Sequence, residues 1–166
     1  MRRESETVTK GETRMKKLCI LADTHGLLRD EVKAELAQAD GILHAGDMDT
    51  DAVLQYLEQC GPLYAVAGNA DKRLTKALPR TLSVRIEGVR FFLVHNKKDI
   101  PASLTDTDVV VVGHSHKYAA EMSGGMLYLN PGGCGRRRFD LELSFCRMLV
   151  SGTSYRYEKI LLPKTL

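Results

Sequence analysis

The sequence predicts a single α/β domain built from layered, mixed β-sheets. Up to residue 67, short apolar runs of strand length alternate with amphipathic helical segments, and from residue 82 only strand patterns follow. A chain of 166 residues is long enough to bury one core without disulfide or metal staples. The early strands also end in polar residues beside glycine, at the edge where open α/β sheets place their sites.

The first strand and the first helix are predicted from an apolar run and from a change of period. Residues 19–22 form an apolar strand that stops at Asp23. Leu28, Val32 and Leu36 then recur at helical spacing, with charged residues between them. This spacing indicates an amphipathic helix that lies on a sheet.

A second strand, a second helix and a third strand follow along the chain. The second strand covers residues 41–45. The helix fits residues 50–60, with Asp49 or Thr50 as its N-cap and a Gly-Pro pair as its stop. The third strand covers residues 63–67 and runs directly into a Gly-Asn pair.

The second half of the chain reads as strands joined by turns. Apolar and polar side chains alternate around tight turns, and four consecutive valines indicate a fully buried strand. The strands are expected at residues 82–86 and 89–94, which form a hairpin, at 109–112 and 126–129, and at 141–150 and 155–162, which form a final hairpin.

The N-terminal residues 1–15 are expected to be a flexible tail, because they carry too few large apolar side chains to order themselves. Residues 16–166 then form the single domain. The net charge of +3 comes from interleaved positive and negative residues, which argues against a dedicated nucleic-acid surface.

The cysteine positions and the hydropathy predict a cytoplasmic protein. Cys19, Cys60, Cys134 and Cys146 lie far apart and never as Cys-x-x-Cys, so we interpret them as free thiols in a reducing compartment. No apolar segment approaches the roughly 20 residues that cross a bilayer, and the basic N-terminus lacks the apolar core of a signal peptide.

Five predicted strands end in side chains that can bind a metal ion. Because the carboxyl ends of such strands meet at one edge, these side chains are expected to converge. A single Asp or His at a strand end usually acts as a local cap, but five coincidences argue against that interpretation. The residues are Asp23 and His25, Asp47, Asn69, His95, and His114 with His116.

Seven oxygen and nitrogen ligands without a thiolate suit two divalent ions of the first transition row. Mn²⁺ is the first choice, with Fe, Ni or Zn²⁺ as alternatives. Asp47 is the only carboxylate that its strand contributes singly, so it is the candidate bridge between the ions. A bridging hydroxide is then the expected nucleophile, and the resulting charge of the site suits a singly negative phosphodiester.

The same residues resemble a known family in their order and spacing. Asp23-x-His25, Gly46-Asp47, Gly68-Asn69, His95 and Gly113-His114-x-His116 are similar to the motifs of the calcineurin-like metallophosphoesterase superfamily, and the short chain resembles its small YfcE-type phosphodiesterase branch. The resemblance implies two packed mixed β-sheets flanked by helices. It also implies one metal held by Asp23, His25, Asp47 and His116, and another held by Asp47, Asn69, His95 and His114.

Two departures from the larger members of the family affect the expected chemistry. Their Gly-Asn pair is followed by a His that assists the leaving group, whereas Ala70 stands here with Asp71 after it. The general acid is therefore unassigned, and the candidate catalytic residues are Asp47, Asn69, His116 and Asp71. The family's metal-binding His is usually followed by Gly, and Asn96, which follows His95 here, is expected to adopt the same left-handed conformation.

Other polar residues near the motifs have simpler interpretations. His44 is expected to pack or hydrogen-bond behind the site without binding metal. Arg136, Arg137 and Arg138 form a charge run that is either solvated or in contact with a phosphate, and Arg29 leaves the same choice open.

The leading hypothesis is a binuclear metal-dependent phosphodiesterase that hydrolyses small phosphodiesters or nucleotides. A phosphomonoesterase or a nuclease could use the same metal core. A non-catalytic scaffold of the retromer-subunit type is the alternative from another class, although scaffolds tend to lose metal ligands and this chain keeps all seven. A small phosphodiester substrate is the expected partner, without a membrane and with nucleic acid disfavoured; a homo-oligomer stays open.

Overall fold

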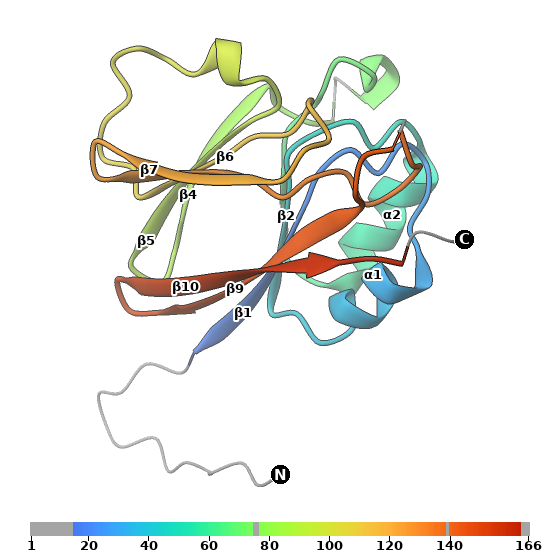
Figure 1. Ribbon diagram of the computed structural model, residues 1–166, viewed down its shortest axis with the longest axis horizontal. Helices are drawn as coiled ribbons and strands as arrows, with labels where there is room; N and C mark the ends of the chain where they lie inside the picture. The colour runs from blue at the N-terminus through green and yellow to red at the C-terminus, as the bar shows by residue number, and fades with distance from the viewer. Residues whose placement is uncertain (1–14, 75–76, 139, 164–166) are drawn as a thin grey trace, which may run out of the picture.

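The computed structural model describes residues 15–74, 77–138 and 140–163, which fold into two five-stranded β-sheets (Figure 1). The first sheet has the order β10-β9-β1-β2-β3. Its three parallel strands form one half, and an antiparallel hairpin completes the other. The strands are β1 (Lys16–Leu21), β2 (Gly41–His44), β3 (Leu63–Ala65), β9 (Ser144–Ser151) and β10 (Ser154–Leu161).

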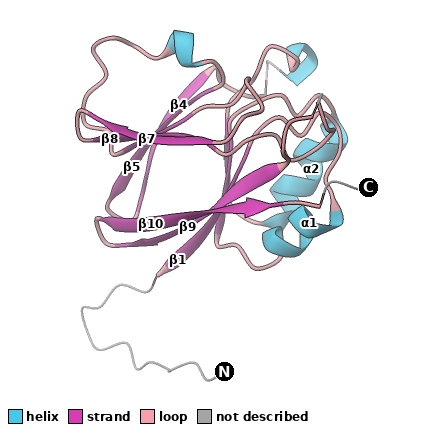
Figure 2. Ribbon diagram, in the orientation of Figure 1, coloured by secondary structure: helices cyan, strands magenta, loops and turns pink. Residues whose placement is uncertain are grey.

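The second sheet has the order β4-β5-β6-β8-β7. Its three central strands are parallel, and an antiparallel strand closes each edge. The strands are β4 (Thr81–Ile86), β5 (Val89–Val94), β6 (Val109–Val111), β7 (Ala119–Ser123) and β8 (Met126–Asn130). Figure 2 shows the two sheets as separate layers of strands.

Two α-helices, α1 (Asp30–Leu36) and α2 (Asp51–Cys60), pack against the first sheet on the side away from the second (Figure 1). The Thr50 hydroxyl caps α2 by accepting a hydrogen bond from the Val53 N–H at 3.3 Å, which confirms one of the two predicted caps. Two short 3₁₀ turns, η1 (Lys72–Leu74) and η2 (Lys97–Asp99), follow β3 and β5.

The core lies in two layers on either side of the first sheet. Leu18 and Ile20 of β1 face the second sheet and pack in one cluster with Phe91. Cys19 and Leu21 alternate with them and face the helices. After two lysines, the last four residues of β1 are buried on both faces, so they form a continuous apolar run without polar alternation.

The predicted fold class is confirmed, including the two packed mixed sheets. The helices, however, flank only the first sheet; the outer face of the second carries a smaller cluster in which Phe92 and Val110 pack with Ile100 and Leu104 of the connecting segment. Strand β7 is not among the predicted strands, because all five of its residues are exposed and neither face is buried, which leaves no clear apolar pattern in the sequence.

Other expectations concern the termini, the thiols and the membrane. The predicted tail lies outside the described residues except for Met15, and the division at residue 15 stays a prediction. All four cysteines are free thiols, as predicted, and three of them are buried. Among the described residues, no helix is long and apolar enough to cross a membrane.

Candidate metal centre

The carboxyl ends of strands from both sheets meet at one end of the molecule. Asp23 and His25 follow β1, Asp47 follows β2 and Asn69 follows β3, while His95 follows β5 and the His114–His116 segment follows β6. The sequence predicted convergence along one sheet edge. The structure instead brings two packed sheets together, each of which contributes part of the ligand set.

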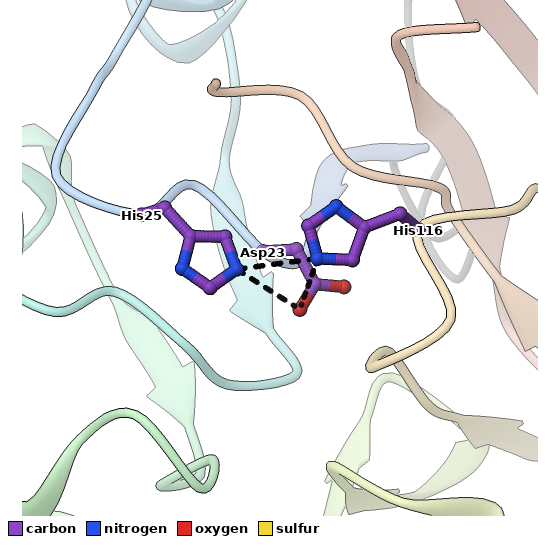
Figure 3. A group of neighbouring side chains, drawn as sticks. All are labelled: Asp23, His25 and His116. Atoms are coloured by element: carbon purple, nitrogen blue, oxygen red, sulfur yellow. Dashed lines mark hydrogen bonds and ion pairs between the residues drawn. The ribbon is translucent and has the colours of Figure 1, made fainter. Parts of the chain in front are cut away.

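One half of the candidate centre is built from Asp23, His25 and His116 (Figure 3). The Asp23 Oδ1 atom lies 3.8 Å from His25 Nε2 and 3.6 Å from His116 Nε2. The two imidazole rings are stacked, and their Nε2 atoms are 3.2 Å apart. Three ligand atoms thus point at one position, as in a site that holds a cation.

The other half is built around Asp47 and His95. The His95 Nε2 atom lies 3.2 Å from Asp47 Oδ2 and 3.9 Å from Asp23 Oδ1. The His114 ring stands edge-on to the His95 ring at 5.2 Å, and Asn69 lines a cavity of about 560 Å³ together with these two histidines. Asp47 Oδ2 is also 3.7 Å from His25 Nε2, so this one carboxylate faces both halves.

Unpaired buried atoms test whether these residues fit a divalent metal. Among the described residues, Asp23 Oδ1 and His95 Nε2 are buried without a hydrogen-bond partner. Burial, with a further contribution from the neighbouring Asp47, raises the pKa of Asp23 to about 7. A bound cation would supply the missing partner for both atoms and favour the ionised carboxylate, so the donor set fits the metals that the motifs imply.

The protonation states of His116 and Asp47 agree with this interpretation. Burial, assisted by the charges of His25 and Arg138, lowers the pKa of His116 to about 4, so at neutral pH its ring is uncharged and can offer a lone pair. Burial opposes ionisation of Asp47, but the neighbouring His95 and the hydrogen bond from the Ala70 N–H outweigh it and lower the pKa of this carboxyl. An uncharged ring makes His116 better suited to metal binding than to the proton donation that the sequence also allowed.

The backbone of the site is held in an uncommon conformation. Left-handed φ values are rare for residues other than glycine, and they concentrate where the surrounding structure imposes them. Six residues at the strand ends of the candidate centre have φ between 45° and 74°: Asp23, His25, Asp47, Asp49, His114 and His116. Such strain at six neighbouring positions indicates a functional site.

Hydrogen bonds fix the orientation of two candidate ligands. The His95 Nδ1–H donates to the Ala45 carbonyl at 2.7 Å, which turns Nε2 toward the site. His25 Nδ1 lies 3.0 Å from Asp49 Oδ2 and presents its Nε2 in the same way. Partners of this kind set the tautomer and the basicity of a metal-binding imidazole. The sequence pattern indicated Asp49 only as a possible helix cap.

His44 lies behind the site, as predicted. It is fully buried, and its Nδ1 accepts a hydrogen bond from the Gly46 N–H at 3.1 Å. Nε2 therefore carries the proton and donates to the Thr24 hydroxyl at 3.0 Å. Burial lowers the pKa of His44 to about 4, so the ring is neutral and connects the loops after β1 and β2.

The geometry does not favour two other expectations. The buried carboxylate of Asp71 accepts hydrogen bonds from the N–H groups of Asp47, Asp49 and Gly68 at 2.7–2.9 Å, an arrangement that positions the loop instead of delivering a proton. The left-handed conformation predicted for Asn96 is wrong. Its φ is −109°, because it caps η2 by accepting a hydrogen bond from the Lys98 N–H.

The arginines differ from one another in their contacts. Arg29 is buried and donates to the Gly135 carbonyl at 2.8 Å, so it connects the segment before α1 to the loop after β8. Arg136 donates to the His25 carbonyl at 3.0 Å. Arg138 reaches the candidate centre itself, with Nη1 at 3.4 Å from His116 Nε2.

Fold and site together define a metal-binding α/β sandwich whose ligands gather at the carboxyl ends of the strands. Residues 15–153 match the model of the calcineurin-like phosphoesterase superfamily domain, and the chain belongs to this family. A probable metallophosphoesterase of Methanothermobacter thermautotrophicus is 29% identical over 128 residues, which cover 68% of this chain and 74% of that protein. The phosphodiesterase MJ0936 of Methanocaldococcus jannaschii is 27% identical, over 71% and 84% of the two chains.

Two solved structures share the fold. The phosphoesterase YfcE of E. coli has a TM-score of 0.66 and 26% identity, over 80% of this chain and 90% of its own. Vacuolar protein sorting 29 of Cryptosporidium parvum has a TM-score of 0.72 and 20% identity, over 90% and 99% of the two chains. The predicted family is confirmed, and the second likeness concerns the fold alone.

Proposed function

We propose that the protein is a binuclear metal-dependent phosphodiesterase that acts on small phosphodiesters or nucleotides. The observation that carries the proposal is the pair of buried, unpaired atoms Asp23 Oδ1 and His95 Nε2, which face the shared carboxylate of Asp47. When bound, two divalent ions, Mn²⁺ by preference, would supply Lewis acidity and activate a water molecule. The four free cysteines support our placement of the enzyme in the cytoplasm.

The two proposed ligand sets correspond to the two halves of the candidate centre. One ion would be held by Asp23, His25, Asp47 and His116, and the other by Asp47, Asn69, His95 and His114. Asp49 and the Ala45 carbonyl orient two of these imidazoles, and Asp71 holds the loop that carries Asp47. The protein's own groups thus orient the reacting partners.

Diesters are favoured over monoesters by charge and by the missing acid. A monoester dianion would bind two ions tightly in its ground state without a matching gain in the transition state. Hydrolysis joins the water oxygen to phosphorus and releases the ester oxygen as an alcohol, which takes up a proton. Because Ala70 cannot donate one, diesters with good leaving groups suit this site best, and the relative named a phosphodiesterase is consistent with diester hydrolysis.

The test combines metal analysis with turnover of bis(4-nitrophenyl) phosphate. We expect close to two ions per chain after reconstitution with Mn²⁺, together with Mn²⁺-dependent hydrolysis. Asp47→Asn should lose both ions and nearly all turnover, since Asp47 faces both halves. His44→Asn is the control and should keep its metal. Absence of metal from the reconstituted protein, or equal losses in both variants, would contradict the proposal.

A scaffold role is the second candidate, because the fold shared with vacuolar protein sorting 29, at a TM-score of 0.72, does not by itself distinguish an enzyme from a scaffold. The retention of all seven candidate ligands weighs against it. The same experiment distinguishes the two candidates. A scaffold would hydrolyse neither diesters nor monoesters, whether or not it binds metal.

A further inference from the structure

Arg138, in the exposed stretch 136–138 of the loop after β8, brings a positive charge to the candidate metal centre. Its Nη1 atom lies 3.4 Å from His116 Nε2, the same nitrogen that faces Asp23 Oδ1 at 3.6 Å. The guanidinium therefore stands next to the position where a metal ligand presents its lone pair.

The loop that carries Arg138 is fastened to the segment that carries Asp23 and His25. Arg29 donates to the Gly135 carbonyl, and Arg136 donates to the His25 carbonyl. Gly135 packs so closely on the Thr24 backbone that a side chain would collide with the Thr24 carbonyl oxygen. The loop that carries Arg138 is thus held against Thr24 and His25, in the segment that also carries the candidate ligands.

Binding of a metal would change what Arg138 can contact. A neutral imidazole nitrogen has one lone pair, so His116 Nε2 cannot serve a metal and accept from Arg138 at once. The guanidinium donors would then be free beside the centre. A planar guanidinium matches the oxygens of a phosphoryl group better than any other side chain does.

We propose that Arg138 binds a non-bridging oxygen of the substrate's phosphoryl group, next to the metal that His116 would hold. This assignment rests on the proposed function, because it concerns part of the same substrate. The charge on the phosphoryl oxygens grows as the reaction proceeds, so a fixed guanidinium there stabilises the transition state more than the ground state. Arg138 also adds positive charge in a site whose leaving group has no assigned acid.

The test compares wild-type protein with Arg138→Ala, Arg138→Lys and Arg137→Ala. The last variant removes one positive charge from the same run and controls for net charge. Isothermal titration gives the Mn²⁺ affinity of the metal-free proteins and the affinity of the Mn²⁺-loaded proteins for inorganic phosphate. Hydrolysis of bis(4-nitrophenyl) phosphate gives kcat and KM.

We expect Arg138→Ala to weaken phosphate binding about 10- to 100-fold, the range for a charge-assisted hydrogen bond, with a fall in kcat/KM. Mn²⁺ affinity should stay within about threefold of wild type, because the metal does not use the guanidinium. Lys keeps the charge but not the planar fork, so Arg138→Lys should recover only part of the loss. Arg137→Ala should match wild type.

Two results would overturn the assignment. Phosphate affinity unchanged in Arg138→Ala would show that the side chain does not touch the phosphoryl group. Loss of Mn²⁺ together with phosphate would make Arg138 a support for His116 instead. Failure of the proposed function looks different: the Mn²⁺-loaded wild type would bind phosphate, and Arg138→Ala would weaken that binding, but neither protein would hydrolyse the diester.

Discussion

Among single residues, Asp49 orients a candidate metal ligand, a role that the sequence motifs did not indicate. Its Oδ2 lies 3.0 Å from His25 Nδ1, and its backbone N–H donates to Asp71 Oδ1 at 2.8 Å. Its own φ is 70°, in the left-handed region. A carboxylate held in this way fixes the His25 tautomer that presents Nε2 to the candidate centre.

Removal of this carboxylate should weaken metal binding. We predict that Asp49→Ala lowers the Mn²⁺ affinity of the protein about 10- to 100-fold, the usual cost of losing a partner of a metal-binding imidazole. Asp49→Asn should fall between, because its amide oxygen can still accept from His25. The measurement is Mn²⁺ titration calorimetry of metal-free protein.

Asp51 provides the matched control for this prediction. It is an exposed acidic residue in the first turn of α2, only two positions further along the chain. Asp51→Ala should leave Mn²⁺ affinity unchanged. If the two alanine variants bind Mn²⁺ equally well, the contact between Asp49 and His25 has no role in holding the metal.

At the scale of elements, the segment after β8 matters as much as the strands. The described residues of this loop, 131–138 and 140–143, form neither helix nor strand, yet the backbone at Gly135 is packed on the segment that follows β1. Gly135 is needed for the close approach to Thr24, since any Cβ would meet the Thr24 carbonyl oxygen, carbon and Cα. The loop is therefore packed directly against the segment that carries Asp23 and His25.

A methyl group at this contact should disturb the site. We predict that Gly135→Ala destabilises the protein by about 1–3 kcal/mol, as overpacked substitutions do, and also lowers Mn²⁺ affinity, because Thr24 lies between Asp23 and His25. Urea unfolding and Mn²⁺ titration measure the two effects.

The control places the same substitution in open space. Gly124 lies in the turn between β7 and β8, where a Cβ would have no neighbouring atom within 4 Å, although its φ is +59°. Gly124→Ala should cost about 1 kcal/mol of backbone strain and leave Mn²⁺ affinity unchanged. Unaltered Mn²⁺ binding in Gly135→Ala would refute the link between this loop and the metal centre.

For the molecule as a whole, the stability of the metal-free protein should depend on pH through the buried His44. Its pKa is lowered to about 4 by burial, below its ordinary value of 6.5. Between these values the unfolded chain takes up a proton that the folded protein does not. The stability that neutral His44 contributes is therefore present above pH 6.5 and is lost as the pH falls toward 4.

The expected loss over this range is about 3 kcal/mol of unfolding free energy. His116 has a similarly lowered pKa and adds to the total, so the contribution of His44 is taken as the difference between wild type and His44→Asn. Urea unfolding of both proteins, with chelator present, at several pH values between about 4 and 7 measures it. A difference that does not shrink as the pH falls would rule out a neutral buried His44.

Much of the site could be predicted from the sequence because its ligands occupy regular positions. Asp23, Asp47 and His95 each follow a strand that the sequence shows as an apolar run, and the carboxyl ends of such strands are where sites form. That His95 belongs to a second sheet, packed on the one that carries Asp23 and Asp47, came only from the structure. The fold class could be predicted for a similar reason, because the apolar periodicity of helices and strands is visible within short stretches of sequence.

The tertiary structure alone decided which polar groups meet. Asp49 lies 24 positions from His25 in the chain, and Arg138 lies 22 positions from His116, and no sequence period connects either pair. The exposed strand β7 is likewise a feature that only the tertiary structure shows, because it is defined by pairing with β8 and not by a pattern of buried side chains. Apolar burial leaves a repeating pattern in the sequence, whereas a single polar contact depends on how two distant loops pack, and that is settled only when the two sheets come together.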